Sequence, residues 1–217
     1  MSLVRNCIVN PPEPLPVSRL PKQTLHHVWS PKLKRALVFT SLDQVRLWVM
    51  LEVNPAVTTY CERPATVSAQ HDCRVDFWLL RDGRPQYLAL GHTDKQAPSG
   101  DGPPAALSSL SIEIIRSIDL DEHRIWIQNW MALLPYLNTG MRLIDVSLAR
   151  DVVNFFDPEA SFLDLEQHFV RHDPVLIRTA AIAGLHAGHL VSADLVAQSW
   201  TLNSRIQQYS KAAHHAA

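Results

Sequence analysis

Residues 74–90, RVDFWLLRDGRPQYLAL, indicate the fold class most directly, because they have the pattern of two strands joined by a tight turn. Apolar and aromatic residues dominate both arms, Arg74–Leu80 and Pro85–Leu90. Asp82 and Gly83 between them tolerate the positive backbone angles of a two-residue turn. This stretch predicts a β-hairpin that carries Asp76 on its first strand.

A helix is predicted before the hairpin, from Ser41 to about Asn54. Ser41-Leu42-Asp43-Gln44 has the pattern of a capping box, in which the serine caps the third amide and the glutamine reaches back. Apolar residues then recur at helical spacing, at Leu42, Val45, Val49 and Val53. Short strands at 57–60, 65–67 and 111–116 and a helix over 121–137 complete an α/β sandwich around a mixed sheet.

The chain is predicted to have four parts: a basic, proline-rich arm at 1–30, an α/β domain at 31–140, a connector at 141–158 and a small helical domain at 159–217. In the helical domain, Asp173-Pro174 has the pattern of a helix start, with aspartate at the cap and proline at the first helical position. Short helices in this arrangement suit a winged-helix-like module. Small helical bundles that only mediate protein contacts have the same pattern.

The composition is that of an ordinary globular protein, with 217 residues, 47% of them hydrophobic and 19% charged. No apolar run approaches the roughly 20 residues of a membrane-spanning helix, so no membrane association is expected. Cys7, Cys61 and Cys73 lack CxxC spacing, which favours reduced thiols in a cytoplasmic protein. Four tryptophans on apolar faces are expected in the core: Trp48, Trp78, Trp126 and Trp130.

The order and spacing of these motifs resemble the TnsA-like endonuclease subunit of heteromeric transposases. Phe39-Thr40-Ser41-Leu42 is similar to that family's Phe-Glu-Ser-x motif, and Val75-Asp76-Phe77 stands where the family has Pro-Asp-Phe. The resemblance also includes Leu51–Pro64, the turn Arg81–Arg84 and the late helix Asn129–Leu137. It implies a restriction-endonuclease-like mixed-sheet domain followed by a small helical, winged-helix-like domain.

The resemblance also shows where this chain departs from a nuclease. Metal-dependent cleavage of a phosphodiester needs hard oxygen ligands for Mg²⁺. Thr40 stands where the family has a helix glutamate, and Gln44 replaces a second acid. Ala89 replaces the strand glutamate, and Gly91 replaces the lysine. Asp76 alone remains, as a vestigial acid and a weak metal candidate, so we expect no catalysis and no cofactor, and we expect its loss to affect stability little.

These departures predict a TnsA-like transposition protein without nuclease activity, acting on DNA as a structural or regulatory partner of a transposase, with a homodimer left open. One alternative is an Mg²⁺-dependent DNA endonuclease whose site is rebuilt from groups beside the same strands: Glu62, His71, Asp72, His92, Asp94 and Lys95. The other is a stand-alone DNA-binding regulator that uses only the helical module.

DNA contacts are expected from five basic residues, although the net charge is −1. Lys32, Lys34 and Arg35 lie at the end of the basic N-terminal stretch, and Arg178 and Arg205 lie in the helical part. The alternative for the arm is a solvated leader that contacts nothing specific. The near-neutral charge balance of the C-terminal part leaves a protein-docking role open. Four histidines are interpreted as surface or partly buried residues: His168, His172, His186 and His189.

Overall fold

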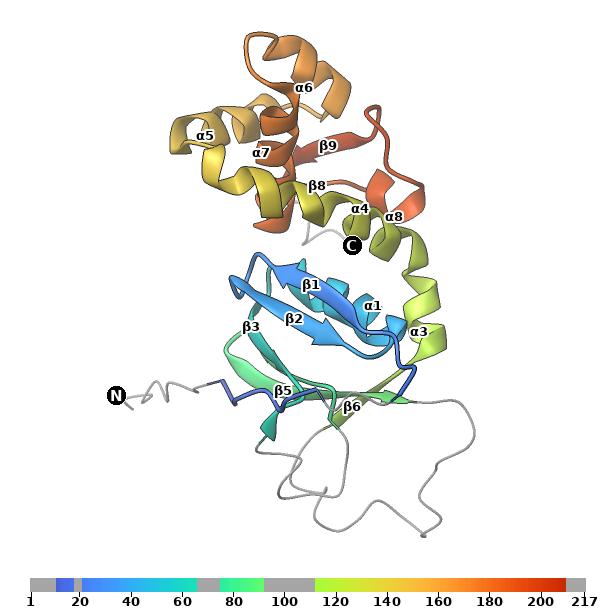
Figure 1. The fold of residues 1–217 in the computed structure, drawn as a ribbon. Helices are drawn as coiled ribbons and strands as arrows, with labels where there is room; N and C mark the ends of the chain where they lie inside the picture. The colour runs from blue at the N-terminus through green and yellow to red at the C-terminus, as the bar shows by residue number, and fades with distance from the viewer. Residues whose placement is uncertain (1–10, 18–20, 66–74, 92–111, 210–217) are drawn as a thin grey trace, which may run out of the picture. The chain divides into compact units, whose positions relative to one another are not determined.

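The structure is a computed structural model that describes residues 11–17, 21–65, 75–91 and 112–209 (Figure 1). The chain divides into two compact units whose segments alternate along the sequence. The first, here named the sheet unit, comprises Met1–His27, Val38–Val45 and Ala56–Leu120. The second, here named the helical unit, comprises Val28–Leu37, Arg46–Pro55 and Asp121–Ala217.

The sheet unit contains a four-stranded sheet in the order β3-β4-β5-β6 (Figure 1). Its strands are β3 (Val57–Glu62), β4 (Phe77–Arg81), β5 (Arg84–Gly91) and β6 (Ile112–Arg116). β3, β4 and β5 are antiparallel neighbours, and β6 runs parallel to β5. The prediction of a mixed α/β protein with a mixed sheet is therefore confirmed.

The predicted hairpin is formed by β4 and β5, which pair from Phe77 with Leu88 to Arg81 with Arg84. Asp82 and Gly83 form the turn, with φ angles of 50° and 73°. Both angles lie in the left-handed region, which aspartate tolerates and glycine adopts freely. Most of the strand expected at 65–67 lies outside the described residues.

The core of the sheet unit is built around Phe77. Its ring centroid lies 5.8 Å from that of Phe39 and 6.4 Å from that of Tyr60. All three side chains are at most 2% exposed. Burying a large apolar side chain stabilises a fold by about 1.5–3 kcal/mol, so this aromatic group anchors the strands to the segment that precedes the first helix.

Two strands that were not predicted precede that helix. β1 (His26–Ser30) and β2 (Arg35–Phe39) form a two-stranded sheet, followed by α1 (Leu42–Glu52). No regular element was predicted before Ser41, and these two strands correct that prediction. Leu37 and Phe39 alternate with more exposed neighbours, which is the period of a strand, but the lysines around them hid this short pattern.

Part of the proline-rich arm is attached to the sheet unit. The backbone N–H of Leu15 donates to the carbonyl of Arg63 at 2.8 Å, and that of Ala65 donates to the carbonyl of Glu13 at 2.9 Å. Pro14 lies opposite Pro64 between these bonds. The segment at 13–15 is thus held as a short strand-like stretch against residues 63–65.

The helical unit consists mainly of helices around a small antiparallel sheet of order β7-β9-β8. After α3 (Ser117–Glu122), whose last two residues belong to this unit, its elements are α4 (Arg124–Gly140), η2 (Met141–Leu143), α5 (Val146–Phe155), β7 (Ala160–Ser161), α6 (Phe162–His168), α7 (Pro174–His186), β8 (Leu190–Val191), α8 (Asp194–Ala197) and β9 (Arg205–Gln208).

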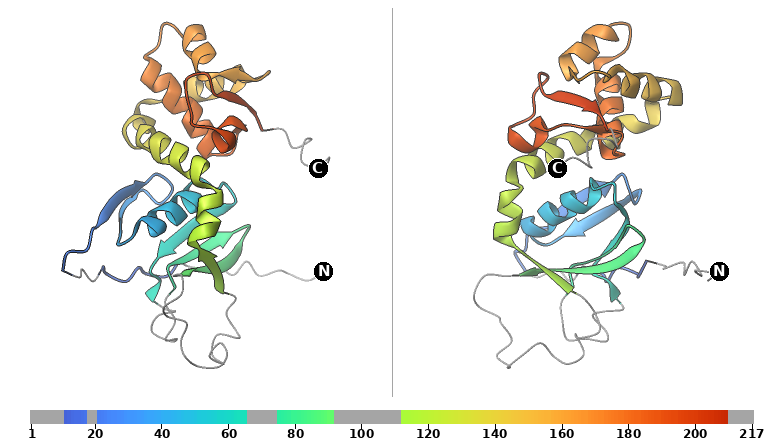
Figure 2. Two further views of the ribbon diagram at one scale, coloured as in Figure 1. Left: turned by 90° about the vertical axis from the view of Figure 1, so that its right-hand side faces the viewer. Right: turned by 180° about the vertical axis from the view of Figure 1, so that it is seen from behind.

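α7 is the central element of the helical unit and packs against α4, α5, α6 and β8 (Figure 2). Its predicted start is confirmed, because Asp173 caps the helix and accepts a hydrogen bond from the N–H of Val175 at 2.7 Å. None of the helices in the described ranges is long and apolar enough to cross a membrane.

The segment at 141–158, expected to be a connector, contains the helix α5. Asp145 caps this helix by accepting a hydrogen bond from the N–H of Leu148 at 2.8 Å. Leu148, Val152 and Phe156 are buried at a spacing of four residues. This stripe was missed because Arg150, Asp151 and Asn154 lie between its members and make the segment look polar.

Candidate functional site

Asp76, the acid that remains among the nuclease-like positions, accepts a hydrogen bond at each carboxylate oxygen. Gln44 Nε2 donates to Oδ1 at 2.9 Å, and the backbone N–H of Leu90 donates to Oδ2 at 2.8 Å. The side chain lies just before β4 and is buried, with the residue 4% exposed. The carboxylate therefore connects the first turn of α1 to β5.

Gln44 is oriented for this bond by Thr40. The carboxamide Oε1 of Gln44 accepts from the N–H of Thr40 at 2.9 Å and from its hydroxyl at 3.1 Å. These two donors fix the oxygen toward Thr40 and leave Nε2 facing Asp76. The capping box is half formed: Ser41 Oγ accepts from the N–H of Gln44 at 3.2 Å, but the glutamine side chain turns to Thr40 and Asp76.

The other two nuclease-like positions lie on β5. Ala89 lies between Leu88 and Leu90, whose carbonyl and N–H respectively bond to the backbone and the side chain of Asp76. Gly91 follows Leu90, and both Ala89 and Gly91 pair with β6, opposite Ile114 and Arg116. The structure thus joins Thr40, Gln44 and Asp76 in one series of hydrogen bonds, and it places Ala89 and Gly91 on either side of Leu90, which donates to Asp76.

In the described part of the chain, the amide of Gln44 and the N–H of Leu90 donate to the buried carboxylate of Asp76, and both groups are neutral. The side-chain N–H of Gln44 directs a partial positive charge at Asp76. A glutamate at position 44 would instead present a negative charge, and a metal cation could then bind between the two carboxylates. Among the described residues, no group of three or more His, Cys, Asp or Glu side chains could hold a metal ion.

The expectation that loss of Asp76 affects stability little was therefore inconsistent with its surroundings. That expectation treated Asp76 as a solitary carboxylate. Its removal would leave the donors on Leu90 and Gln44 unpaired in a buried place, and an unpaired buried donor costs about 1–3 kcal/mol.

One member of the alternative, rebuilt metal site falls within the described residues. Glu62 at the end of β3 has a side chain that is 4% exposed, and its Oε1 lies 3.8 Å from Nη2 of Arg63. The remaining members lie outside the described residues: His71, Asp72, His92, Asp94 and Lys95.

Lys32, a predicted DNA contact, binds backbone carbonyl groups at the C-terminal end of α1. Its Nζ donates to the carbonyls of Leu51 and Asn54, both at 2.8 Å, where α1 ends. A cation at this end also compensates the negative pole of the helix. Burial lowers the pKa of Lys32 to about 8, although the nearby Glu52 carboxylate opposes this change.

The other four predicted DNA contacts differ in their exposure. Arg178 on α7 forms an ion pair with Glu166, and its side chain is 22% exposed. Arg35 is half-buried, and Lys34 is exposed in the turn between β1 and β2. The side chain of Arg205 on β9 is 56% exposed and lies 4.0 Å from Asp164. Lys34 and Arg205 are therefore the most accessible of the five.

A buried carboxylate in the helical unit was not singled out by the sequence. Glu52, at the last position of α1, is fully buried. Its oxygens accept hydrogen bonds from Ser30 Oγ at 2.6 Å and from the N–H of Lys32 at 2.8 Å, and one lies 3.1 Å from Nε2 of His186. Glu52 follows Val45 and Val49 on the apolar face of the helix, and an acid on such a face is the signal that would have revealed it.

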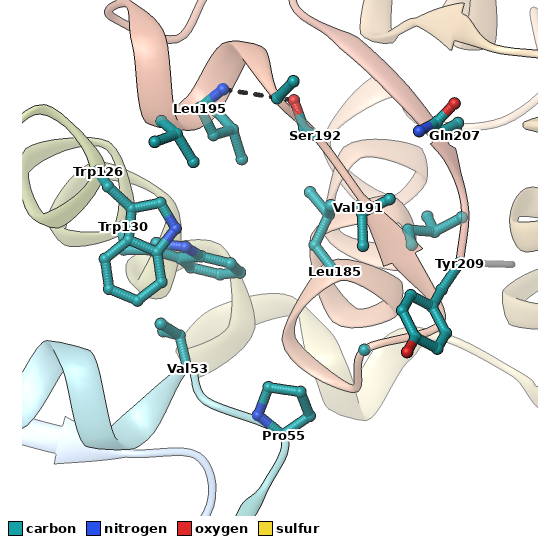
Figure 3. Close-up of a pocket in the computed structure, with 14 residues that line it drawn as sticks. Val53, Pro55, Trp126, Trp130, Leu185, Val191, Ser192, Leu195, Gln207 and Tyr209 are labelled. Carbon is teal, nitrogen blue, oxygen red and sulfur yellow. Dashed lines mark hydrogen bonds between the residues drawn. The ribbon is translucent and has the colours of Figure 1, made fainter. Parts of the chain in front are cut away.

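The helical unit also contains an apolar pocket of about 620 Å³ (Figure 3). Two indole rings form one of its sides, with Trp126 and Trp130 packed edge to face at 6.5 Å. Trp48, Trp78 and Trp130 are buried as predicted, but Trp126 is half-buried, so its placement in the core was wrong. The side chains that line the pocket are nearly all uncharged and apolar, and include Val53, Pro55, Leu185, Val191 and Leu195.

Comparisons with known proteins do not identify the chain. No protein-family model matches it, and no curated protein matches it at a significant level.

Proposed function

We propose that this chain is a TnsA-like protein without nuclease activity that serves transposition as a structural partner of a transposase on DNA. The observation that carries the proposal is the bond from Gln44 to Asp76. An amide satisfies the acid that a nuclease would use to bind a metal ion. A site so arranged preserves the local fold and has no use for Mg²⁺.

The order of helices and strands in each unit supports a more specific assignment of the two folds. The sheet unit has a helix start before β3 and the acid at the entry to β4, in the order expected of a restriction-endonuclease-like domain. In the helical unit, the order along the chain is α5, β7, α6, α7, β8, the short helix α8 and β9, and β9 lies between the two other strands of the sheet. This helix and strand order supports a winged-helix-like domain.

A role in protein contact suits the helical unit better than sequence-specific reading of DNA. A recognition helix presents exposed side chains to the major groove. Most of α7 is buried instead, at Ile177, Thr179, Ala180, Ala181, Ile182, Gly184 and Leu185. Its one arginine, Arg178, is paired with Glu166. The stand-alone DNA-binding regulator is therefore the weaker candidate.

Co-purification tests the partner role. The full chain is expressed with an affinity tag together with a transposase subunit of a heteromeric transposon from the same genome. We expect the two proteins to be captured together and to form a joint complex with labelled transposon-end DNA. Failure of capture together with failure of the joint complex would contradict the proposal.

A cleavage assay tests the absence of nuclease activity. The purified chain is incubated with supercoiled plasmid and Mg²⁺ or Mn²⁺, and no nicked product is expected. Nicking that disappears in Asp76→Ala, at a temperature where both proteins are folded, would favour the endonuclease alternative. Nicking that persists in Asp76→Ala would come from groups other than Asp76, either in the rebuilt site or in a contaminating enzyme, and would be tested again in Glu62→Ala.

A further inference from the structure

Two arginines face each other at the tip of the β4–β5 hairpin. Arg81 ends β4 and Arg84 begins β5, and they are direct partners in the strand register. Residues paired in this way project their side chains from the same face of the sheet, with Cβ atoms about 5 Å apart. Like charges at directly opposed positions destabilise a hairpin, so the pair calls for a compensating anion.

The surroundings within the described residues do not supply that anion. Neither guanidinium group forms an ion pair or a side-chain hydrogen bond with any described residue. Asp82 in the turn is the nearest acid in sequence, yet no ion pair joins it to either arginine. Arg84 is exposed and Arg81 is half-buried, so both can be reached from solvent.

A second observation at the hairpin tip is a buried polar atom whose hydrogen-bonding capacity the described part of the chain does not satisfy. Among the described residues, the buried Nε atom of Arg81 has no hydrogen-bond acceptor. A buried donor that belongs to a charged group is costly to leave unpaired, and an anionic oxygen is the acceptor that forms the strongest hydrogen bond with it.

We propose, on the basis of the function proposed above, that Arg81 and Arg84 bind a backbone phosphate of DNA. A phosphodiester carries one negative charge and presents two acceptor oxygens to a planar guanidinium group. Bound between the two arginines, it removes their mutual repulsion. These residues are separate from the five basic residues selected from the sequence, and they place a DNA contact on the sheet unit.

The test measures DNA affinity against salt concentration, without added metal. The full chain binds a fluorescein-labelled duplex of about 30 base pairs, and anisotropy is followed from about 50 to 300 mM KCl. Arg81→Gln/Arg84→Gln should weaken binding roughly tenfold or more at about 100 mM KCl. The slope of log affinity against log salt should fall by about 0.9, which is the contribution of the one phosphate contact that is lost.

Two control variants separate a phosphate site from a general charge effect. Arg150→Gln/Arg171→Gln removes the same charge from exposed positions of the helical unit and should leave the slope unchanged. Arg81→Lys/Arg84→Lys keeps the charge and should keep most of the slope while losing part of the affinity. Urea unfolding of the Gln pair should show no loss of stability, because a like-charged pair is removed.

The outcomes distinguish this inference from the proposed function. If the wild type binds the duplex and the Gln pair at positions 81 and 84 binds equally well, the hairpin site is refuted while the DNA role stands. If the wild type shows no DNA binding, both the DNA role and the site fail. If the Gln pair loses binding to labelled poly-L-glutamate but not to DNA, the surface serves an acidic protein, and the phosphate assignment is wrong.

Discussion

Gln44 Nε2 lies 2.9 Å from Asp76 Oδ1 and donates a hydrogen bond to it, which joins the first turn of α1 to the entry of β4. A glutamate at position 44 would place a second negative charge against Asp76 and would require a cation between the two groups. The amide performs the same connection without one. Several predictions about stability and metal response depend on this difference.

Removal of the Asp76 side chain should destabilise the protein. Asp76→Ala leaves the N–H of Leu90 and one N–H of Gln44 without acceptors, and we expect a loss of about 2–4 kcal/mol in the free energy of unfolding. Urea denaturation followed by circular dichroism measures the loss. Asp151→Ala, at an exposed position of α5, serves as the control and should change stability by less than about 0.5 kcal/mol. Equal stability of Asp76→Ala and wild type would show that the chain from Thr40 to Leu90 is not formed.

Restoring an acid at position 44 should create a response to metal. Gln44→Glu sets two carboxylates together in a buried place, which destabilises the metal-free protein by about 1–3 kcal/mol through repulsion and desolvation. Mn²⁺ at millimolar concentration should raise the melting temperature of this variant and leave that of the wild type unchanged. Gln128→Glu on the exposed face of α4 should show no Mn²⁺ effect. An equal shift in all three proteins would place the bound metal elsewhere.

Lys32 should give the protein an alkaline pH dependence. Its pKa is lowered from 10.5 to about 8 in the folded state. Between these values the unfolded chain binds more protons than the folded one, so the contribution of Lys32 to stability rises with pH. The free energy of unfolding of the wild type, minus that of Lys32→Met, should therefore increase by about 2–3 kcal/mol from pH 7 to pH 10.5. Each pKa unit of difference between the folded and unfolded states corresponds to about 1.4 kcal/mol. Lys34→Met, in the same turn but exposed, should show a flat difference. A difference that falls with pH would contradict the buried position of the ammonium group.

The contact between Glu52 and His186 should be measurable as a coupling energy. Glu52→Gln and His186→Gln are each expected to destabilise the protein by about 1–4 kcal/mol, since Glu52 is fully buried. The double variant should lose about 0.5–3 kcal/mol less than the sum of the two. His189→Gln, at an exposed position beyond the end of α7, replaces His186→Gln in the control cycle and should show no coupling with Glu52→Gln. Additivity in the His186 cycle would mean that the two side chains do not interact in solution.

Local sequence patterns predicted the sheet unit well where they were strong. The two-residue turn at Asp82 and Gly83 fixes the pairing of β4 with β5, and the apolar spacing from Leu42 to Val53 fixes α1. Weaker patterns failed. β2 alternates over only five residues, and α5 buries only Leu148 and Val152 among its ten residues. In both cases the elements are stabilised by packing against segments distant in the sequence, and a local window does not contain that information.

The residues of the candidate sites were also predicted only in part from the sequence. The resemblance to the nuclease family selected Thr40, Gln44 and Asp76 from the sequence, and the fold brings these three residues together. The consequence for Asp76 was misjudged, because the N–H of Leu90 is a backbone donor and leaves no trace in the side-chain pattern. The partners of Glu52 were not accessible to sequence reasoning either. His186 follows Glu52 by 134 positions, and only the tertiary fold determines that they meet.

That separation also affects synthesis on the ribosome. Glu52 and the buried face of α1 leave the exit tunnel well before His186 is translated, and the intervening 134 residues take about 7–27 s to make at roughly 5–20 residues per second. During this interval the nascent chain exposes Trp48 and Val49, which are buried in the finished protein, without the rest of the helical unit to cover them. A chaperone that binds exposed apolar segments would therefore find this part of the nascent chain accessible until α7 is made.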